Sequence, residues 1–145
     1  MTTVSDEATQ TSADLCQACI AALIGSQAGI TGALVSTVDG FAVAAQVRPP
    51  VSGDRLAAMT SSLVALVDAV SQDGGIGEGR DIVVDATAGR LLLLDVPQAG
   101  SKLILTVLCD PSATPGQVLW AARRCREHLS ARLPAPGVQE LVHER

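Results

Sequence analysis

The stretch "GALVSTVDGFAVAAQV", residues Gly32 to Val47, reads as two short strands joined by Asp39-Gly40. An Asp-Gly pair between apolar runs is a strong hairpin signal, and it suits a two-residue turn in which both central residues take positive φ. The flanking strands are apolar at successive positions, so we expect a sheet that is covered on both faces. The stretch contains no histidine, lysine or arginine, which leaves little with which to catalyse a reaction.

The composition of the chain narrows the class of protein. A length of 145 residues fits one domain, and a hydrophobic content of 48% argues against disorder. The net charge is −5 and aromatic residues are nearly absent, so we expect no nucleic-acid partner. No apolar run approaches the roughly 20 residues of a membrane helix, and the N-terminus lacks a signal-peptide pattern. We expect a cytoplasmic protein without membrane insertion, whose four cysteines stay reduced.

Signals on both sides of the hairpin predict an α+β fold. We expect one domain over residues 12–133, between a flexible N-terminal tail over 1–11 and a C-terminal tail over 134–145. The element order α-β-β-α-β-β-β-α predicts a five-stranded antiparallel sheet with helices on both faces. The predicted elements are a helix over 12–24, strands over 32–38 and 41–47, a helix over 52–72, strands over 81–86, 90–96 and 102–110, and a helix over 114–133.

The second predicted helix has two different faces. One is an apolar stripe at helical spacing, which we expect to pack on the core. This stripe consists of Leu56, Met59, Leu63, Leu66 and Val70. The opposite face carries small residues where a helix that faces water usually carries lysine and glutamate, so it indicates close packing against a second helix. This small-residue stripe consists of Ala58, Ser61, Ser62, Ala65 and Ala69.

The sequence shows neither a phosphate-binding loop nor catalytic machinery. The run "GGIGEG", residues 74–79, follows a predicted helix and precedes a strand, whereas a dinucleotide fingerprint lies between a strand and a helix. His128 and His143 are the only histidines, and no serine lies in a G-x-S-x-G elbow. Aspartates at strand ends are ordinary turn residues. We therefore expect no enzyme activity and no cofactor.

Two cysteine pairs raise a metal-binding hypothesis. Cys16 and Cys19 form a C-x-x-C pair, Cys125 and His128 form a C-x-x-H pair, and together they offer the four ligands of a structural zinc site. The alternative is that these thiols are small apolar packing residues, as free cysteines often are. The packing role is favoured because a domain of this length has enough core without a metal.

The ordered set of elements resembles the roadblock/light-chain-7 domains, and the bacterial MglB-type regulators in particular. The resemblance covers about Asp14 to Leu133. It rests on "GALVSTVDGFAVAA", "DRLAAMTSSLVALVDAV", "IVVDATAGRLLLLDV" and "LILTVLCDPSATPGQVLWAARRCREHL". The resemblance implies a roadblock/profilin-like fold and a non-enzymatic module. Such modules form homodimers or heterodimers and act as regulators, GTPase-activating proteins, adaptors or scaffolds for Ras-like small GTPases.

In the arrangement of these domains the strand "DIVVDA", residues 81–86, lies at the edge of the sheet. Ile82, Val83 and Val84 are apolar on both of its faces, and no proline or lysine protects the edge from pairing. We therefore expect a homodimer that joins two sheets edge to edge and packs the second helices together through their small-residue stripes.

Three functions remain open on the sequence. The first is regulation or recruitment of a Ras-like small GTPase, with Arg55 and Asp68 as the expected partner-binding residues and Arg55 as the candidate arginine finger. The second is a structural scaffold without a GTPase partner. The third is a metal- or redox-sensing module that uses the two cysteine pairs.

Overall fold

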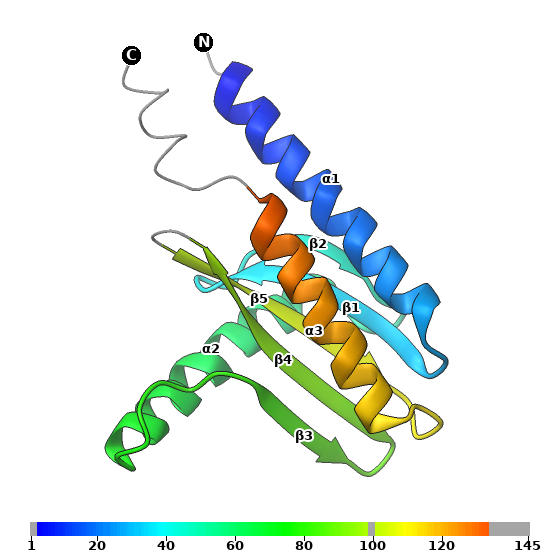
Figure 1. The fold of residues 1–145 in the computed structure, drawn as a ribbon, viewed down its shortest axis with the longest axis vertical. Helices are drawn as coiled ribbons and strands as arrows, with labels where there is room; N and C mark the ends of the chain where they lie inside the picture. The colour runs from blue at the N-terminus through cyan, green and yellow to red at the C-terminus, as the bar shows by residue number, and fades with distance from the viewer. Residues whose placement is uncertain (1–2, 99–100, 134–145) are drawn as a thin grey trace.

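Five antiparallel strands form one sheet in the order β2-β1-β5-β4-β3 (Figure 1). The computed structural model describes residues 3–98 and 101–133. Its elements are α1 (Thr3–Ser26), β1 (Ile30–Thr37), β2 (Ala42–Gln46), α2 (Gly53–Asp73), β3 (Ile82–Ala86), β4 (Gly89–Gln98), β5 (Ser101–Cys109) and α3 (Pro115–Arg132). The predicted α+β class, element order and edge position of β3 are confirmed.

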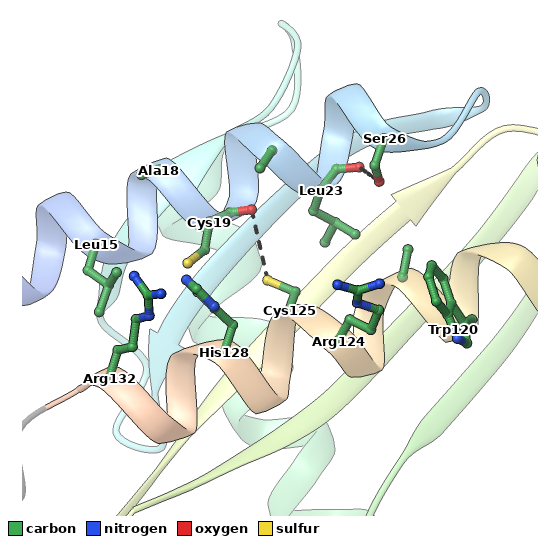
Figure 2. A pocket seen from close by; sticks show the side chains of 12 residues that line it. Leu15, Ala18, Cys19, Leu23, Ser26, Trp120, Arg124, Cys125, His128 and Arg132 are labelled. Atoms are coloured by element: carbon green, nitrogen blue, oxygen red, sulfur yellow. Dashed lines mark hydrogen bonds between the residues drawn. The ribbon is translucent and has the colours of Figure 1, made fainter.

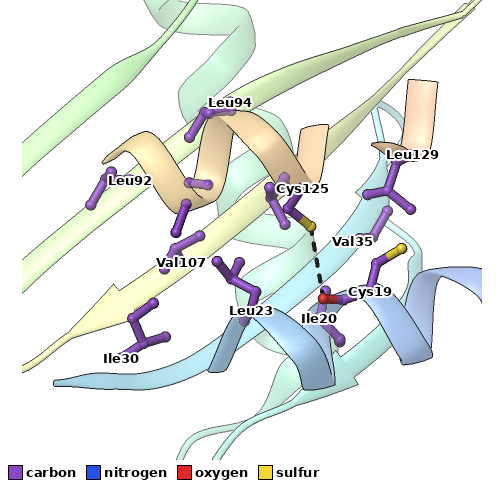
Figure 3. Packing of buried hydrophobic residues seen from close by; sticks show 14 of the residues in the cluster. Cys19, Ile20, Leu23, Ile30, Val35, Leu92, Leu94, Val107, Cys125 and Leu129 are labelled. Carbon is purple, nitrogen blue, oxygen red and sulfur yellow. Dashed lines mark hydrogen bonds between the residues drawn. The ribbon is translucent and has the colours of Figure 1, made fainter. Parts of the chain in front are cut away.

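The helices α1 and α3 lie side by side and cover one face of the sheet (Figure 1). The two helices contact each other directly, and the thiol of Cys125 donates a long hydrogen bond of 3.9 Å to the backbone oxygen of Cys19 (Figure 2). Beneath them, aliphatic side chains of the helices and of the central strands form the main core (Figure 3). Members of this core include Ile20, Leu23, Val35, Leu92, Val107 and Leu129.

The helix α2 covers the opposite face, where it contacts β1, β2 and β5. Its N-terminus is capped by Ser52, whose hydroxyl accepts a hydrogen bond from the amide of Arg55. The fully buried residues of α2 are the small Ala57 and Thr60, and the hydroxyl of Thr60 bonds the carbonyl of Ala57. The covering of the sheet on both faces is therefore confirmed, but α2 packs on it through small residues.

The predicted orientation of α2 is wrong for three of the five residues of its apolar stripe. Met59, Leu66 and Val70 are 54%, 62% and 63% exposed, and the remaining two residues of the stripe are half-buried. The sheet face beneath α2 already carries large buried side chains, among them Leu34 and Ile104. Small helix residues fit against large sheet residues at native packing density, so the larger helix residues lie on the outer side.

The turn of the first hairpin also differs from the prediction. Positive φ occurs at Gly40 (98°), and among the described residues no non-glycine residue, Asp39 included, adopts it. The amide of Thr37 donates to the carbonyl of Phe41, and the Thr37 hydroxyl accepts from the Phe41 amide. These bonds close a three-residue loop in which one glycine supplies the left-handed conformation, so the positive φ expected at Asp39 is not needed.

The first helix begins earlier than predicted. The polar residues before Ser12 were expected to form a tail, yet α1 already begins at Thr3. Glutamate, alanine and glutamine in this segment favour helix without giving it an apolar stripe, so hydrophobic periodicity does not reveal it. The predicted C-terminal tail, 134–145, lies outside the described residues. No helix in the described part of the chain has both the length and the apolar character needed to cross a bilayer.

Candidate interaction surface

Exposed aliphatic side chains gather on α2, on the loop after it and on β3. We call this set the α2–β3 surface, and it consists of Met59, Leu66, Val70, Ile76 and Val84, while Val83 is exposed on the opposite face of β3. Single exposed apolar residues are common, but several on one helix and the strand that follows it are typical of a surface that a partner covers. Lysine is absent from α2 and from β3, so no flexible charged side chain of that kind covers these residues.

The small residues predicted at the helix seam lie along the side of α2 next to this surface. Ala58, Ala65 and Ala69 are exposed, as is Ser62, whereas Ser61 is half-buried. Ser61 is half-buried because the tip of the first hairpin approaches α2 there: a Cβ on Gly40 would lie 3.4 Å from the Cα of Ala58 and from the Oγ of Ser61.

The edge strand β3 pairs with β4 only, so its other side is open in the monomer. Val83 and Val84 are exposed on opposite faces of this strand, and Ile82 is half-buried. The start of β3 is fixed by Asp81, whose carboxylate lies 2.8 Å from the guanidinium of Arg126 on α3. The structure thus presents an ordered, unprotected strand edge.

The two predicted partner-binding residues lie far apart and have different surroundings. Arg55 is exposed in the first turn of α2. Asp68 is half-buried, and its carboxylate accepts a hydrogen bond of 3.1 Å from the amide of Gly79, which holds the loop after α2 against the helix. Thirteen residues of helix separate them by roughly 20 Å. They do not form a joint site, and Asp68 already has a structural role.

The cysteine pairs do not assemble the zinc site that the sequence raised as a hypothesis. Cys16, Cys19 and Cys125 are buried between α1, α3 and the sheet, while His128 is exposed. Burial raises the pKa of Cys16 to about 11 and that of Cys125 to about 12, and the neighbouring thiols add to both shifts. Within residues 3–98 and 101–133, no three His, Cys, Asp or Glu side chains come together as metal ligands. The structure therefore favours the packing role of these thiols.

The glycine run after α2 is a connector between α2 and β3. Gly74 caps the C-terminus of α2, and Gly75 and Gly77 have positive φ. A phosphate cradle uses the free amides at a helix N-terminus, whereas this run leads from a helix C-terminus into a strand. Its position matches the prediction that it is a connector.

The exposed apolar residues of α2 are the part of the α2–β3 surface that the sequence did not predict. A signal for it was present, because a second stripe on the same helix, Ala57, Thr60, Val64 and Val67, also has helical spacing. Size patterning, with small helix residues opposite a sheet of leucine and isoleucine, would have selected the correct inward face.

Comparisons with known proteins agree with this architecture. The Roadblock/LC7 domain model matches residues 19–109. The uncharacterized protein MJ1340 of Methanocaldococcus jannaschii is 25% identical over 103 residues, which cover 71% of this chain and 87% of that protein. Among solved structures, Myxococcus xanthus MglB matches with a TM-score of 0.73 at 17% identity, over 82% of this chain and 87% of that chain.

A Roadblock/LC7 domain from Streptomyces avermitilis matches with a TM-score of 0.71 at 23% identity, over 81% of this chain and 96% of that chain. At such identities the two structures establish a shared fold. The family model spans more than half of the chain, and the described elements have the order and the sheet that the resemblance implies. The chain therefore belongs to the Roadblock/LC7 domain family.

Proposed function

We propose that this chain is a non-catalytic, homodimeric interaction module that regulates or recruits a Ras-like small GTPase. Membership of the Roadblock/LC7 family supports this role, because the resemblance to MglB-type regulators implies a GTPase partner. The observation that carries the proposal is the row of exposed aliphatic side chains on the outer side of α2. Exposed apolar side chains grouped in this way mark surfaces that bind other proteins.

The dimer uses the α2–β3 surface. Two copies of β3 pair edge to edge across a two-fold axis, which satisfies the open backbone groups of both strands. Two copies of α2 then pack together, with Met59 and Leu66 supplying apolar area. Ala65 and Ala69 beside them allow close approach of the helices. The seam is thus wider than the small-residue stripe alone.

The chain contributes surface to the GTPase and does not bind nucleotide itself. Its glycine run does not precede a helix, so it lacks the amide cradle that holds phosphates. Phe41 is exposed at the tip of the first hairpin, next to the N-terminal half of α2 where Arg55 lies. An exposed aromatic residue and an exposed arginine are typical of protein contacts, so we assign partner binding to this end of α2.

The cytoplasm is the proposed location. All four cysteines are free thiols, and Cys16 and Cys125 lie in the core, where a reducing compartment preserves them.

The test is direct binding to the small Ras-like GTPases of the same organism, purified and loaded with GDP or with a non-hydrolysable GTP analogue. Interferometry with the immobilised chain should show binding that differs between the two nucleotide states. A matched chain with Phe41→Ser should bind more weakly and keep its circular dichroism. Equal affinity for the two nucleotide states, or no binding at all, would favour the structural scaffold without a GTPase partner.

A further inference from the structure

A groove runs between α1 and α3, on the face of the sheet opposite α2 (Figure 2). Its volume is about 560 Å³, within the roughly 300–1,000 Å³ typical of ligand pockets. Its floor is apolar and consists of Leu15, Cys19, Leu23, Ala121 and Cys125. We call it the α1–α3 groove. No residue of the α2–β3 surface lines it.

One side of the groove is formed by a regular row of side chains on α3. Trp120, Arg124, His128 and Arg132 follow one another at four-residue intervals, so each turn of the helix adds one side chain to the row. Figure 2 shows His128 and Arg132 extending from α3 toward α1. Arg132 and Cys19 both line the groove, and the Arg132 charge opposes the rise in the pKa of Cys19 that burial causes. The row is roughly 18 Å long.

Among the side chains that the structure describes, no ion pair joins Arg124 or Arg132 of this row to a carboxylate. The ion pairs there use Arg90, Lys102, Arg123 and Arg126, and no carboxylate is among the described residues that line the groove. The whole chain has a net charge of −5, so a basic groove is a local exception. Such a concentration of charge above an apolar floor favours an anionic, amphipathic occupant.

Trp120 lies at one end of the row, and its exposure indicates that a partner contacts the groove there. It is 58% exposed, and the guanidinium carbon of Arg124 lies 4.8 Å from the centre of its ring. The core contains neither of the two aromatic residues of the chain. Tryptophan and arginine are the residues that most often dominate the binding energy of interfaces, so their pairing at an exposed position indicates a partner there.

We propose that the α1–α3 groove binds an amphipathic helix of a partner protein whose apolar stripe is flanked by a row of aspartate or glutamate. A third helix can lie in the seam between two packed helices, with its apolar residues on the floor. Carboxylates at every third or fourth position of that helix would meet Arg124, His128 and Arg132 turn by turn. The length of the whole row, from Trp120 to Arg132, favours a helix of about three turns over a small anion, which would engage one turn.

The probe is an 18-residue tryptophan-free helical peptide with leucine at positions i, i+3, i+4 and i+7 of its repeat and glutamate beside them. A second peptide has glutamine in place of each glutamate. Trp120 is the only tryptophan of the chain, so its fluorescence reports occupancy of the groove. We expect a spectral shift with the acidic peptide and about tenfold weaker binding of the glutamine peptide, because the exposed ion pairs with Arg124 and Arg132 are lost.

Matched variants test the position of the site. The double substitution Arg124→Gln and Arg132→Gln should weaken the acidic peptide about tenfold, whereas Arg123→Gln on the same helix, outside the groove, should not. Equal binding of both peptides, equal effects of the two variants, or no response up to millimolar peptide would overturn the proposal.

Other occupants give distinct results, and each of them would also overturn the proposal. A response that appears only in a chain shortened after Leu133 would assign the groove to residues 134–145. A response to laurate as strong as that to the peptide would assign it to a small anionic amphiphile. Self-association that Arg124→Gln and Arg132→Gln abolish would assign it to a second copy of this chain. Because the α2–β3 surface is not involved, the test is independent of the proposed function.

Discussion

The guanidinium of Arg126 lies 2.8 Å from the carboxylate of Asp81, and this ion pair ties α3 to the residue that precedes β3. Both side chains are 23% exposed, so the charge-assisted hydrogen bond is partly shielded from water. Arg123 reaches the same carboxylate at 3.8 Å but is 51% exposed. The carboxylate of Asp81 thus links the open edge of the sheet at β3 to the helix α3.

The first prediction concerns this ion pair. Arg126→Ala should lower the free energy of unfolding by about 1.5–3 kcal/mol, because it removes a hydrogen bond between charged groups and leaves Asp81 partly buried. Arg123→Ala is the matched control and should cost about 0–1 kcal/mol, the usual range for an exposed pair. Urea unfolding followed by circular dichroism, at one protein concentration, measures both. Equal losses would show that Arg126 does not anchor the strand.

The second prediction concerns the thiols. Since burial raises the pKa of Cys16 to about 11 and of Cys125 to about 12, both stay protonated at pH 8 and react slowly with a disulfide reagent. In the native protein these two cysteines should react far more slowly than in denaturant, where all four thiols become available. The rate of colour release with Ellman's reagent gives the comparison. Fast native reaction of Cys125 would revive the redox hypothesis.

The third prediction concerns the pH dependence of stability. Burial raises the pKa of Asp95, and the ammonium of Lys102, 3.6 Å away, offsets part of that rise. A folded-state pKa above the unfolded value means that stability is lost as pH rises through the folded pKa. Asp95→Asn should therefore have a higher Tm than the parent at pH 7, with a difference that shrinks toward about pH 4. A lower Tm of the variant at pH 7 would contradict this.

The fourth prediction concerns Arg55. If the chain stimulates GTP hydrolysis by a partner, we expect it to act by ordering the switch segments of that partner, and an inserted arginine is the direct alternative. Arg55→Ala should then leave the stimulated rate within about twofold. Phosphate release under single-turnover conditions measures the rate. A loss of about 1,000-fold would identify Arg55 as an arginine finger.

The sequence predicted most of the fold because local signals agreed with one another. Asp39-Gly40 between apolar runs predicted the hairpin, and Ser52 predicted the start of α2 to within one residue. The open edge at β3 was implied by the resemblance and is present. The hairpin and the start of α2 depend on residues that are close in the sequence. The open edge depends on the strand order that the family resemblance implies.

Features that depend on contacts between elements far apart in the sequence could not be predicted in this way. Which stripe of α2 faces inward is decided by the size of the sheet residues beneath it, such as Leu34, and these are distant in the sequence. The α1–α3 groove arises from side chains about 100 residues apart, such as Cys19 and Cys125. The four-residue row on α3 was readable, but its position beside an apolar floor required the fold.

Ala65→Arg tests whether the α2–β3 surface and the small residues beside it form the self-association seam. Ala65 is exposed in the monomer, so arginine is compatible with the fold and its circular dichroism should match that of the parent. In a close-packed seam the same side chain places an unpaired charge against its symmetry mate. The matched control is Ala28→Arg, an exposed alanine in the turn between α1 and β1, which should not affect association.

Multi-angle light scattering at micromolar concentration is the deciding measurement. We expect the parent chain and Ala28→Arg to have the mass of two chains, about twice 14.8 kDa, and Ala65→Arg to have the mass of one. A dimeric Ala65→Arg variant, or a parent chain that is monomeric at this concentration, would contradict this expectation.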